Sequence, residues 1–387
     1  MGHIPYGRQD VTAEDIAAVE TVLRSDWLTQ GPAVEQFEDA VRRYCGAGHA
    51  VAMNSATSAL HVACMALDLG PGDLLWTSPN TFVASANAAL YCGAEVDFVD
   101  IDERTYNMSV TALADKLAKA RRNGKLPKIV MPVHFAGQSC DMRSIGKLAQ
   151  EYGFKVIEDA SHAIGGRYLG KPVGTCEYSS IAVFSFHPVK IVTTAEGGMA
   201  VTNDPETAER MRVLRSHGVT RDPKRMRAAP PGPWYYEQVA LGYNYRMTDI
   251  HAALGVSQMK RIDAYVHARH AIARRYDEAL SDLTAVLPWQ DPDCYSAYHL
   301  YPVQIDAKRT SRTRGEVFAR LRQHDIGVNV HYIPVHTQPY YRALGFADKT
   351  FPVAERYYEG AISLPLFPAL DAARQDSVAH ALREALA

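Results

Sequence analysis

The chain has 387 residues, which is enough for two or three domains of ordinary size. With 41 Lys and Arg residues against 43 Asp and Glu residues, the formal net charge is −2, which argues against a nucleic-acid-binding protein or one held on an anionic membrane. A content of 47% hydrophobic and 22% charged residues is typical of a globular protein, and it excludes a disordered tail protein.

The six cysteines are too few for a disulfide scaffold and form no C-x-x-C pair, so we expect neither a zinc site, nor any other metal site, nor a redox motif. Reduced thiols in a cytoplasmic protein are the expectation. The N-terminal sequence lacks the apolar core of a signal peptide. The longest uncharged run, Leu74–Ala94, contains Pro79 and many polar residues and is a poor candidate for a membrane span.

Helices and strands alternate through the first 220 residues. Leu60, Ala63, Cys64 and Leu67 repeat at helical spacing, and Gly70 with Pro71 ends the helix predicted over 57–69. Further helices are predicted at about 82–91, 111–121 and 142–152, and strands at 74–77, 94–99, 128–133, 154–157 and 180–186. This alternation predicts an α/β fold with a largely parallel sheet, which binds ligands beyond the carboxyl ends of its strands.

The pattern changes after residue 220. Three prolines within 230–233 predict that 221–234 is an exposed loop. One long helix is predicted from Met247 to about Leu280, leading into a smaller α+β unit. That unit is expected to contain strands at 299–305 and 327–331 and helices at 312–324 and 374–386. We therefore expect a large domain over 1–250 and a small C-terminal domain over 251–387.

Two segments in the first half could carry chemistry. Asn54–Ala59 consists of small polar residues and alanines that open a helix, where free N–H groups can bind phosphate or where Ser and Thr simply cap the helix. In the segment Val156–Ala163, an apolar strand ends in a carboxylate. Asp159 could be a metal ligand, a catalytic acid, an ion-pair partner for a heterocycle, or only a cap of the next turn.

Two more segments follow. Lys190 comes after the apolar strand predicted over 180–186 and before a glycine-containing turn, a place where an amine can be partly desolvated. A neutral lysine amine is the form that makes Schiff bases, although most lysines are solvated surface groups. Gly242–Asp249 enters the long helix and could be no more than its cap.

Together these segments supply what pyridoxal phosphate requires. That cofactor needs an amine to bond, a carboxylate facing its pyridine nitrogen, a phosphate cradle and a flat face against its ring. The carboxylate keeps the ring nitrogen protonated, so that the ring accepts electrons from the broken Cα–H bond.

The sequence resembles the sugar aminotransferases of the DegT/DnrJ/EryC1/StrS family from Tyr6 to about Pro368. Several motifs occur in the same order as in that family, which makes the resemblance specific. They are LTQGP (28–32), NSATSAL (54–60), TFVASAN (81–87), EDASHA (158–163), FSFHPVK (184–190), TTAEGG (193–198), GYNYRMTD (242–249) and SLPLFP (363–368).

The resemblance implies fold-type-I architecture, as in aspartate aminotransferase, with a large mixed, mostly parallel sheet domain and a smaller α+β domain. It implies that Lys190 bonds the cofactor, that Asp159 faces the pyridine nitrogen, and that Phe82 and His162 lie on either side of the ring. The implied phosphate contacts are Ala56, Thr57, Ser58, Ser185 and, from the neighbouring subunit of a homodimer, Asn244. A lysine at 190 favours amino transfer over the dehydratase branch of the family, which carries histidine there.

A finer resemblance, carried by 215–219, 329–336 and 340–341, points to the pseudaminic acid branch of the family. It implies that L-glutamate gives its amino group to the 4-keto group of a UDP-linked 4-keto-6-deoxy-N-acetylhexosamine. The residues it places against the nucleotide sugar are Tyr6, Asp26, Trp27, Leu28, Thr29, Asn329, His331 and Tyr332. Arg246, with His331, is a candidate for the negative charges of the substrate.

Three alternatives stay open. The enzyme could aminate another nucleotide-linked 3-keto or 4-keto sugar. It could run another fold-type-I reaction, although a desulfurase needs a mobile cysteine and residues 221–234 contain none. It could also bind nucleotide sugars without turnover, against which an intact Lys190 and Asp159 argue.

Overall fold

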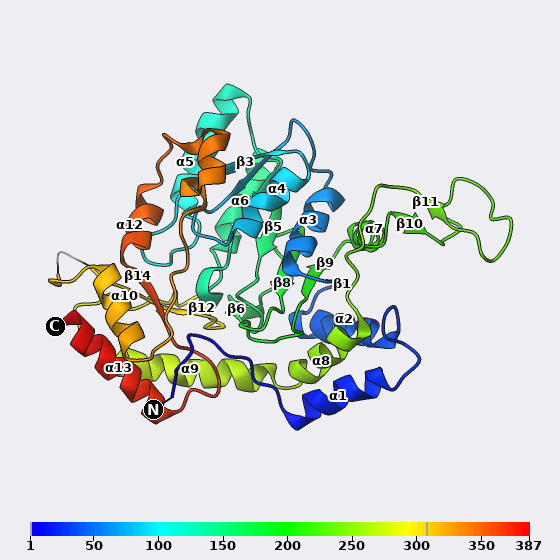
Figure 1. Ribbon diagram of the computed structural model, residues 1–387. Coiled ribbons are helices and arrows are strands. Elements are labelled where there is room, and N and C mark those ends of the chain that lie inside the picture. The colour runs from blue at the N-terminus through cyan, green and yellow to red at the C-terminus, as the bar shows by residue number, and fades with distance from the viewer. Residues whose placement is uncertain (1, 307–308) are drawn as a thin grey trace.

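The computed structural model describes residues 2–306 and 309–387. Its centre is a seven-stranded sheet in the order β1-β9-β8-β5-β4-β2-β3 (Figure 1). The strands are β1 (His49–Met53), β2 (Leu74–Thr77), β3 (Glu95–Phe98), β4 (Ile129–Met131), β5 (Lys155–Asp159), β8 (Ile181–Ser185) and β9 (Gly198–Thr202). Only β9 runs against its neighbours, while β8, β5, β4, β2 and β3 are parallel. The expected α/β class with a mostly parallel sheet is confirmed.

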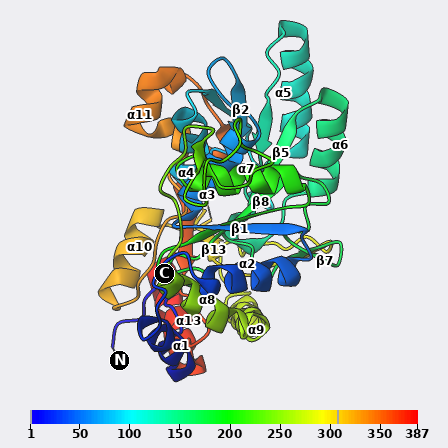
Figure 2. The ribbon, with the colours of Figure 1, turned by 90° about the vertical axis from the view of Figure 1, so that its right-hand side faces the viewer.

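Helices cover both faces of this sheet (Figure 2). One face is covered by α3 (Ala56–Ala66), α4 (Val83–Tyr91) and α7 (Pro205–Arg215). The other is covered by α2 (Pro32–Cys45), α5 (Val110–Asn123) and α6 (Met142–Tyr152). Every residue of β8 and β9 is buried, as expected for strands that are covered on both sides. The N-terminal α1 (Ala13–Leu23) packs against α8 (Asp249–Met259).

The C-terminal residues build a separate hydrophobic cluster. It surrounds the antiparallel pair of β13 (Tyr301–Gln304) and β14 (Ala361–Leu364), flanked by α9 (Ile262–Ala279), α10 (Arg314–Gln323) and α13 (Ala372–Leu386). Ile4 belongs to this cluster, because its backbone exchanges hydrogen bonds with Asp325 and Gly327. The N-terminal segment therefore packs on C-terminal elements. The division at residue 250 stays a prediction.

The single helix predicted over 247–280 is wrong. It breaks into α8 and α9 at Lys260 and Arg261, where the Lys260 N–H donates to the Ser257 carbonyl, three residues back. The Arg261 guanidinium is drawn to Asp15 at 2.5 Å. Apolar residues continue on both sides of the break, so periodicity alone gives no sign of a bend made by a distant carboxylate.

The strand predicted over 327–331 is also wrong. Asn329 forms only an isolated bridge with Ser363, while Gly327 bonds to Ile4 instead of to a sheet neighbour. The backbone of 327–331 therefore bonds to Ile4 at one end and to Ser363 further on. The side chains of Asn329 and His331 line a cavity described below.

The remaining elements are short. They are α11 (Pro339–Tyr341), α12 (Pro352–Gly360), β6 (Arg167–Tyr168), β7 (Lys171–Pro172), β10 (Val219–Thr220), β11 (Glu237–Gln238) and β12 (Cys294–Tyr295). The expected loop over 221–234 lies between β10 and β11 and extends away from the body of the molecule (Figure 1). Within the described ranges, no helix is long and apolar enough to cross a membrane.

Candidate active site

The carboxyl ends of β5 and β8 meet the beginning of α3 at a cavity of about 470 Å³. β5 ends at Asp159 and β8 at Ser185, and Lys190 lies in the turn that follows β8. Eleven of the residues expected in the site line this cavity: Tyr6, Ala56, Thr57, Phe82, Asp159, His162, Ser185, Lys190, Asn329, His331 and Tyr332. Residues from both ends of the chain thus converge on one place.

Asp159 is buried and fixed on both carboxylate oxygens. Its Oδ2 accepts a 2.6 Å hydrogen bond from the Ser85 hydroxyl, and its Oδ1 accepts from the Ser161 N–H at 3.1 Å. The Ser85 hydroxyl lies 2.7 Å from that of Thr81, so the first turn of α4 supports the carboxylate. Asp159 is therefore a rigid negative group at the wall of the cavity.

The Lys190 side chain lies in the same cavity, and its Nζ has no hydrogen-bond partner among the described residues. Burial lowers the pKa of this amine to about 8, although the nearby Asp159 carboxylate acts in the opposite direction. A larger share of Lys190 is therefore neutral near pH 7 than for a solvated lysine, and the neutral amine is the nucleophilic form.

The start of α3 forms a cradle for an anion. Ser55 caps the helix by accepting from the Ser58 N–H, which leaves the N–H groups of Ala56 and Thr57 without partners in the described structure. Gly198 makes the close packing possible, because a Cβ there would lie 2.4 Å from the backbone of Ser55. Ser58 itself is buried, and its hydroxyl donates to Asn54 at 2.6 Å, so it does not line the cavity.

Histidine and tyrosine rings also line the cavity. The Ala136 N–H donates to Nδ1 of His162, so the proton of that ring is on Nε2, which donates to the Tyr332 hydroxyl at 3.0 Å. Burial and then the Lys190 charge lower the pKa of His162, which agrees with this neutral form. Burial, again with the Lys190 charge, lowers the pKa of His331 to about 3.

Several expected residues lie elsewhere. Asn244 is exposed and bridges to Ser216, and Thr29 of the 26–29 turn bridges to Thr248. Arg246 lines a second cavity of about 670 Å³ together with Gln30, Arg221 and Tyr236. In a single chain, these residues are not brought together with Lys190.

Sequence reasoning missed two residues of the site. Ser85 contacts Asp159 from α4, and its hydroxyl three positions after Phe82 in the TFVASAN motif was the available signal. His299 lines the cavity with its ring 4.3 Å from that of His162, and its buried Nδ1 has no partner in the described structure. It precedes β13, and nothing in the local sequence predicts that the backbone before this strand bonds to Ala136 and Gly137.

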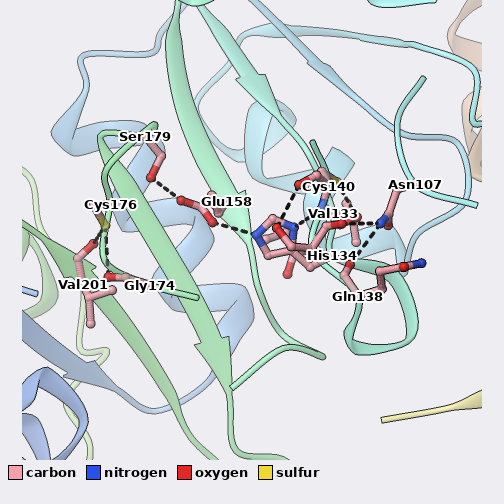
Figure 3. A network of polar contacts seen from close by, with 12 residues as sticks. Asn107, Val133, His134, Gln138, Cys140, Glu158, Gly174, Cys176, Ser179 and Val201 are labelled. Carbon is pink, nitrogen blue, oxygen red and sulfur yellow. Dashed lines mark hydrogen bonds and ion pairs between the residues drawn. The ribbon is translucent and has the colours of Figure 1, made fainter. Parts of the chain in front are cut away.

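Behind Asp159 lies a buried polar network (Figure 3). Nε2 of His134 lies 2.7 Å from Glu158 Oε2, the Ser179 hydroxyl donates to Glu158 Oε1, and the Cys140 N–H donates to His134 Nδ1 at 3.1 Å. Asn107 holds the same turn by donating to the carbonyls of Gln138 and Ser139. Glu158 and His134 are 5% and 0% exposed, so the network is shielded from water.

Comparison with known proteins identifies the chain. The model of the DegT/DnrJ/EryC1/StrS aminotransferase family matches residues 9–383. The chain belongs to this family. It is 41% identical over 384 residues to the spore coat polysaccharide biosynthesis protein SpsC of Bacillus subtilis, covering 98% of this chain and 96% of that protein.

Solved structures of family members superpose closely. Helicobacter pylori PseC, an aminotransferase involved in the biosynthesis of pseudoaminic acid, matches with a TM-score of 0.90 and 32% identity over 99% of both chains. A Streptococcus pneumoniae relative solved in its PLP form matches with a TM-score of 0.87 and 28% identity over 100% of both chains. This member of the DegT/DnrJ/EryC1/StrS family is therefore a sugar aminotransferase of fold type I that uses pyridoxal phosphate.

The cavity fits this cofactor. The contact of Gly198 with Ser55 leaves no room for a side chain and keeps the start of α3 open to a phosphate. The Lys190 amine has no hydrogen-bond partner within the described part of the chain, and Asp159 is held rigidly at the cavity wall. Phe82, the N-cap of α4, is 58% exposed over the cavity and offers a flat apolar face to a ring.

Proposed function

We propose that this sugar aminotransferase moves an amino group from L-glutamate to the 4-keto group of a UDP-linked 4-keto-6-deoxy-N-acetylhexosamine. The product is a UDP-4-amino sugar, for pseudaminic acid or a related nucleotide sugar. The observation that carries the amino-transfer part is the unpartnered Lys190 amine beside the fixed carboxylate of Asp159. The similarity to PseC supports the sugar.

The roles proposed for the cofactor contacts come from the family resemblance, and the residues concerned all line the cavity. Asp159 would face the pyridine nitrogen, Phe82 and His162 would flank the ring, and Ala56, Thr57 and Ser185 would hold the phosphate. Bound pyridoxal phosphate withdraws electrons from the carbon that loses its proton. A rigid carboxylate serves this purpose because it keeps the ring nitrogen protonated without having to move.

Lys190 then acts as the general base and acid. Its amine would take the Cα proton of glutamate and deliver a proton to the former aldehyde carbon of the cofactor. In the second half of the reaction it would take a proton from that carbon and deliver one to C4 of the sugar. An amine with a pKa of about 8 can perform both tasks near neutral pH. The buried His331 and the half-buried Tyr332 line the cavity and limit the access of water.

The nucleotide sugar is expected at two places. Tyr6 and Asn329 contact one another and, with His331 and Tyr332, leave room for the sugar in the cavity of Lys190. The diphosphate is assigned to Arg246 and the 26–29 turn beside the second cavity. Within the described ranges, neither Arg246 nor Arg221 there is paired with an acidic side chain, so both are available for an anion.

The separation of these places supports a homodimer in which each site takes Asn244 and Arg246 from the partner subunit. Its test is co-expression of Lys190→Ala with Asn244→Ala. Hybrid dimers would hold one site with both native residues and regain activity that neither parent shows. No regain would mean that Asn244 serves its own chain.

We also place the enzyme in the cytoplasm, on the basis of its six free cysteines.

The proposed reaction is tested by isotope transfer. Purified cofactor-loaded protein is incubated with ¹⁵N-labelled L-glutamate and UDP-4-keto-6-deoxy-N-acetylhexosamine epimers, and the product is analysed by NMR. The expected product carries ¹⁵N on C4. Label on C3, or turnover only with a sugar linked to another nucleotide, would show that the substrate is a different keto sugar from the one proposed. Binding without any label transfer would favour the non-catalytic alternative.

A further inference from the structure

Strand β5 ends in two carboxylates that point to opposite faces of the sheet. Val156 packs in the cluster under α5 and α6, whereas Ile157 packs in the cluster under α3 and α4. Because side chains alternate along a strand, Glu158 shares the face of Val156 and Asp159 shares that of Ile157. The two are 5% and 4% exposed, so two buried acids stand back to back.

The partner of Glu158 is a histidine whose tautomer is fixed. Nδ1 of His134 accepts from the Cys140 N–H, so the ring proton is on Nε2 and is donated to Glu158 Oε2 (Figure 3). The Ser179 hydroxyl takes the other carboxylate oxygen. No lysine or arginine among the described residues pairs with Glu158.

The same histidine holds Asp159 through the backbone. The His134 N–H donates to the Asp159 carbonyl at 3.0 Å, and the Asp159 N–H donates to the Pro132 carbonyl at 2.9 Å. Glu158, on the face of the sheet opposite to Asp159, accepts a hydrogen bond from the ring of His134. Because the backbone of His134 is bonded to Asp159, a shift of the ring would move Asp159 as well.

The turn that starts at His134 also sets His162. The Ala136 N–H donates to Nδ1 of His162, and the Ala136 carbonyl accepts from the His299 N–H at 2.8 Å. The Phe135 N–H is held by Asn107 at 2.8 Å. Asp159, His162 and His299 thus depend on one hydrogen-bonded turn, although they come from different segments.

We propose that Glu158 and His134 are positioning residues, which fix Asp159 and the tautomer of His162 through the 134–140 turn without touching the cofactor. The inference rests on the proposed roles of Asp159 and His162. It requires a hydrogen-bond acceptor in the right place at residue 158 rather than a negative charge there. A neutral amide oxygen can also accept from His134 Nε2, although more weakly than a carboxylate.

The first test compares Glu158→Gln with Glu158→Leu, and uses Glu177→Gln as the matched control. Glu177 is an exposed carboxylate that accepts from Lys171 at 2.9 Å, and among the described residues no hydrogen bond joins it to the 134–140 turn. The readouts are the affinity of the apoprotein for pyridoxal phosphate and the pH titration of the visible band of the loaded protein. A third readout is the rate of the glutamate half-reaction.

For Glu158→Leu we expect a shifted titration of the band and a half-reaction slower by about 100-fold, the effect of a misplaced catalytic group. Glu158→Gln should stay within about 3-fold of the control on the same scale. The inference is overturned if Glu158→Leu behaves like Glu177→Gln, or if Glu158→Gln loses as much as Glu158→Leu. If the native protein ignores glutamate, the proposed function fails, while the affinity and the titration still test the positioning.

A second test needs no substitution in this network. ¹⁵N-histidine NMR of the native holoprotein should show His134 and His162 as neutral rings with the proton on Nε2. Tyr332→Phe, which removes the acceptor of His162, should change the His162 signals and leave those of His134 in place. A proton on Nδ1 of His134 would overturn the inference even if Glu158→Leu failed to fold.

Discussion

The hydroxyl of Ser85 donates a 2.6 Å hydrogen bond to Oδ2 of Asp159. Ser85 is fully buried in the first turn of α4, and Phe82, the N-cap of that helix, lies over the same cavity. One helix start therefore supports the carboxylate and supplies the aromatic face. The position of Asp159 is fixed from the front by α4 and from behind by the turn of His134.

Replacing Ser85 with alanine should therefore weaken catalysis more than stability. A hydrogen bond to a charged group contributes about 1.5–3 kcal/mol of free energy. Losing part of this in the position of Asp159 should slow the glutamate half-reaction by about 10-fold. Single-turnover absorbance measurements check this. Ser109→Ala is the control, since Ser109 only caps α5, and its loss should cost about 1 kcal/mol of stability with no change in rate. Equal rates in the two variants would contradict the role of Ser85.

The pKa of Lys190, lowered by burial to about 8, predicts how cofactor attachment depends on pH. Only the neutral amine attacks the aldehyde, so attachment to apoprotein should speed up as the pH rises and level off above about 8. Stopped-flow recording of the visible band measures this rate. A rate that keeps rising up to the pH range of a solvated lysine would show that the amine is not desolvated.

Gly198→Ala should damage the phosphate cradle. The new Cβ would lie 2.4 Å from the Ser55 backbone and 2.5 Å from the Ala56 nitrogen, so β9 and the start of α3 must move apart. We expect at least about a 10-fold loss of affinity for pyridoxal phosphate, because the preorganised N–H groups are displaced. Equilibrium dialysis with the apoprotein measures it.

Gly70→Ala is the matched control for this substitution, because a Cβ at Gly70 meets nothing within 4 Å. It should bind the cofactor like the native protein. Unchanged affinity in Gly198→Ala would mean that the phosphate does not depend on this contact.

Arg246→Gln should separate the two halves of the reaction. Loss of a guanidinium that binds a diphosphate should raise the KM for the UDP-sugar by about 10-fold or more, while the glutamate half-reaction stays the same. Steady-state kinetics with each substrate varied measures the difference. Arg225→Gln is the control, since Arg225 is already paired with Glu206 at 2.7 Å. If both variants have the same KM for the UDP-sugar, Arg246 does not bind this substrate.

The sequence predicted the centre of the site because the chemistry is local there. Asp159 and Lys190 each follow an apolar strand, and the rule that ligands bind at the carboxyl ends of parallel strands places both at one edge. Their meeting also requires β5 and β8 to be neighbours, which they are. The resemblance to a family supplied the residues that have no local signature, such as Tyr6 and Asn329.

What could not be predicted depends on distant contacts. The helical pattern breaks at Arg261, whose guanidinium pairs with Asp15, 246 residues away in sequence. His299 reaches the cavity because its N–H bonds to the Ala136 carbonyl. The motif 242–249 likewise gives no sign that Asn244 and Arg246 lie away from Lys190 in a single chain. A sequence motif does not tell which subunit's site its residues join.

We propose that Lys190 and Asp159 together carry out an amino transfer from glutamate to a UDP-linked 4-keto sugar. The visible spectrum of the cofactor-loaded protein, recorded as L-glutamate and then the keto sugar are added, tests this proposal. Glutamate should abolish the band, the UDP-4-keto sugar should restore it, and Lys190→Ala should respond to neither. A native band that glutamate leaves unchanged would show that these two residues do not perform this transfer.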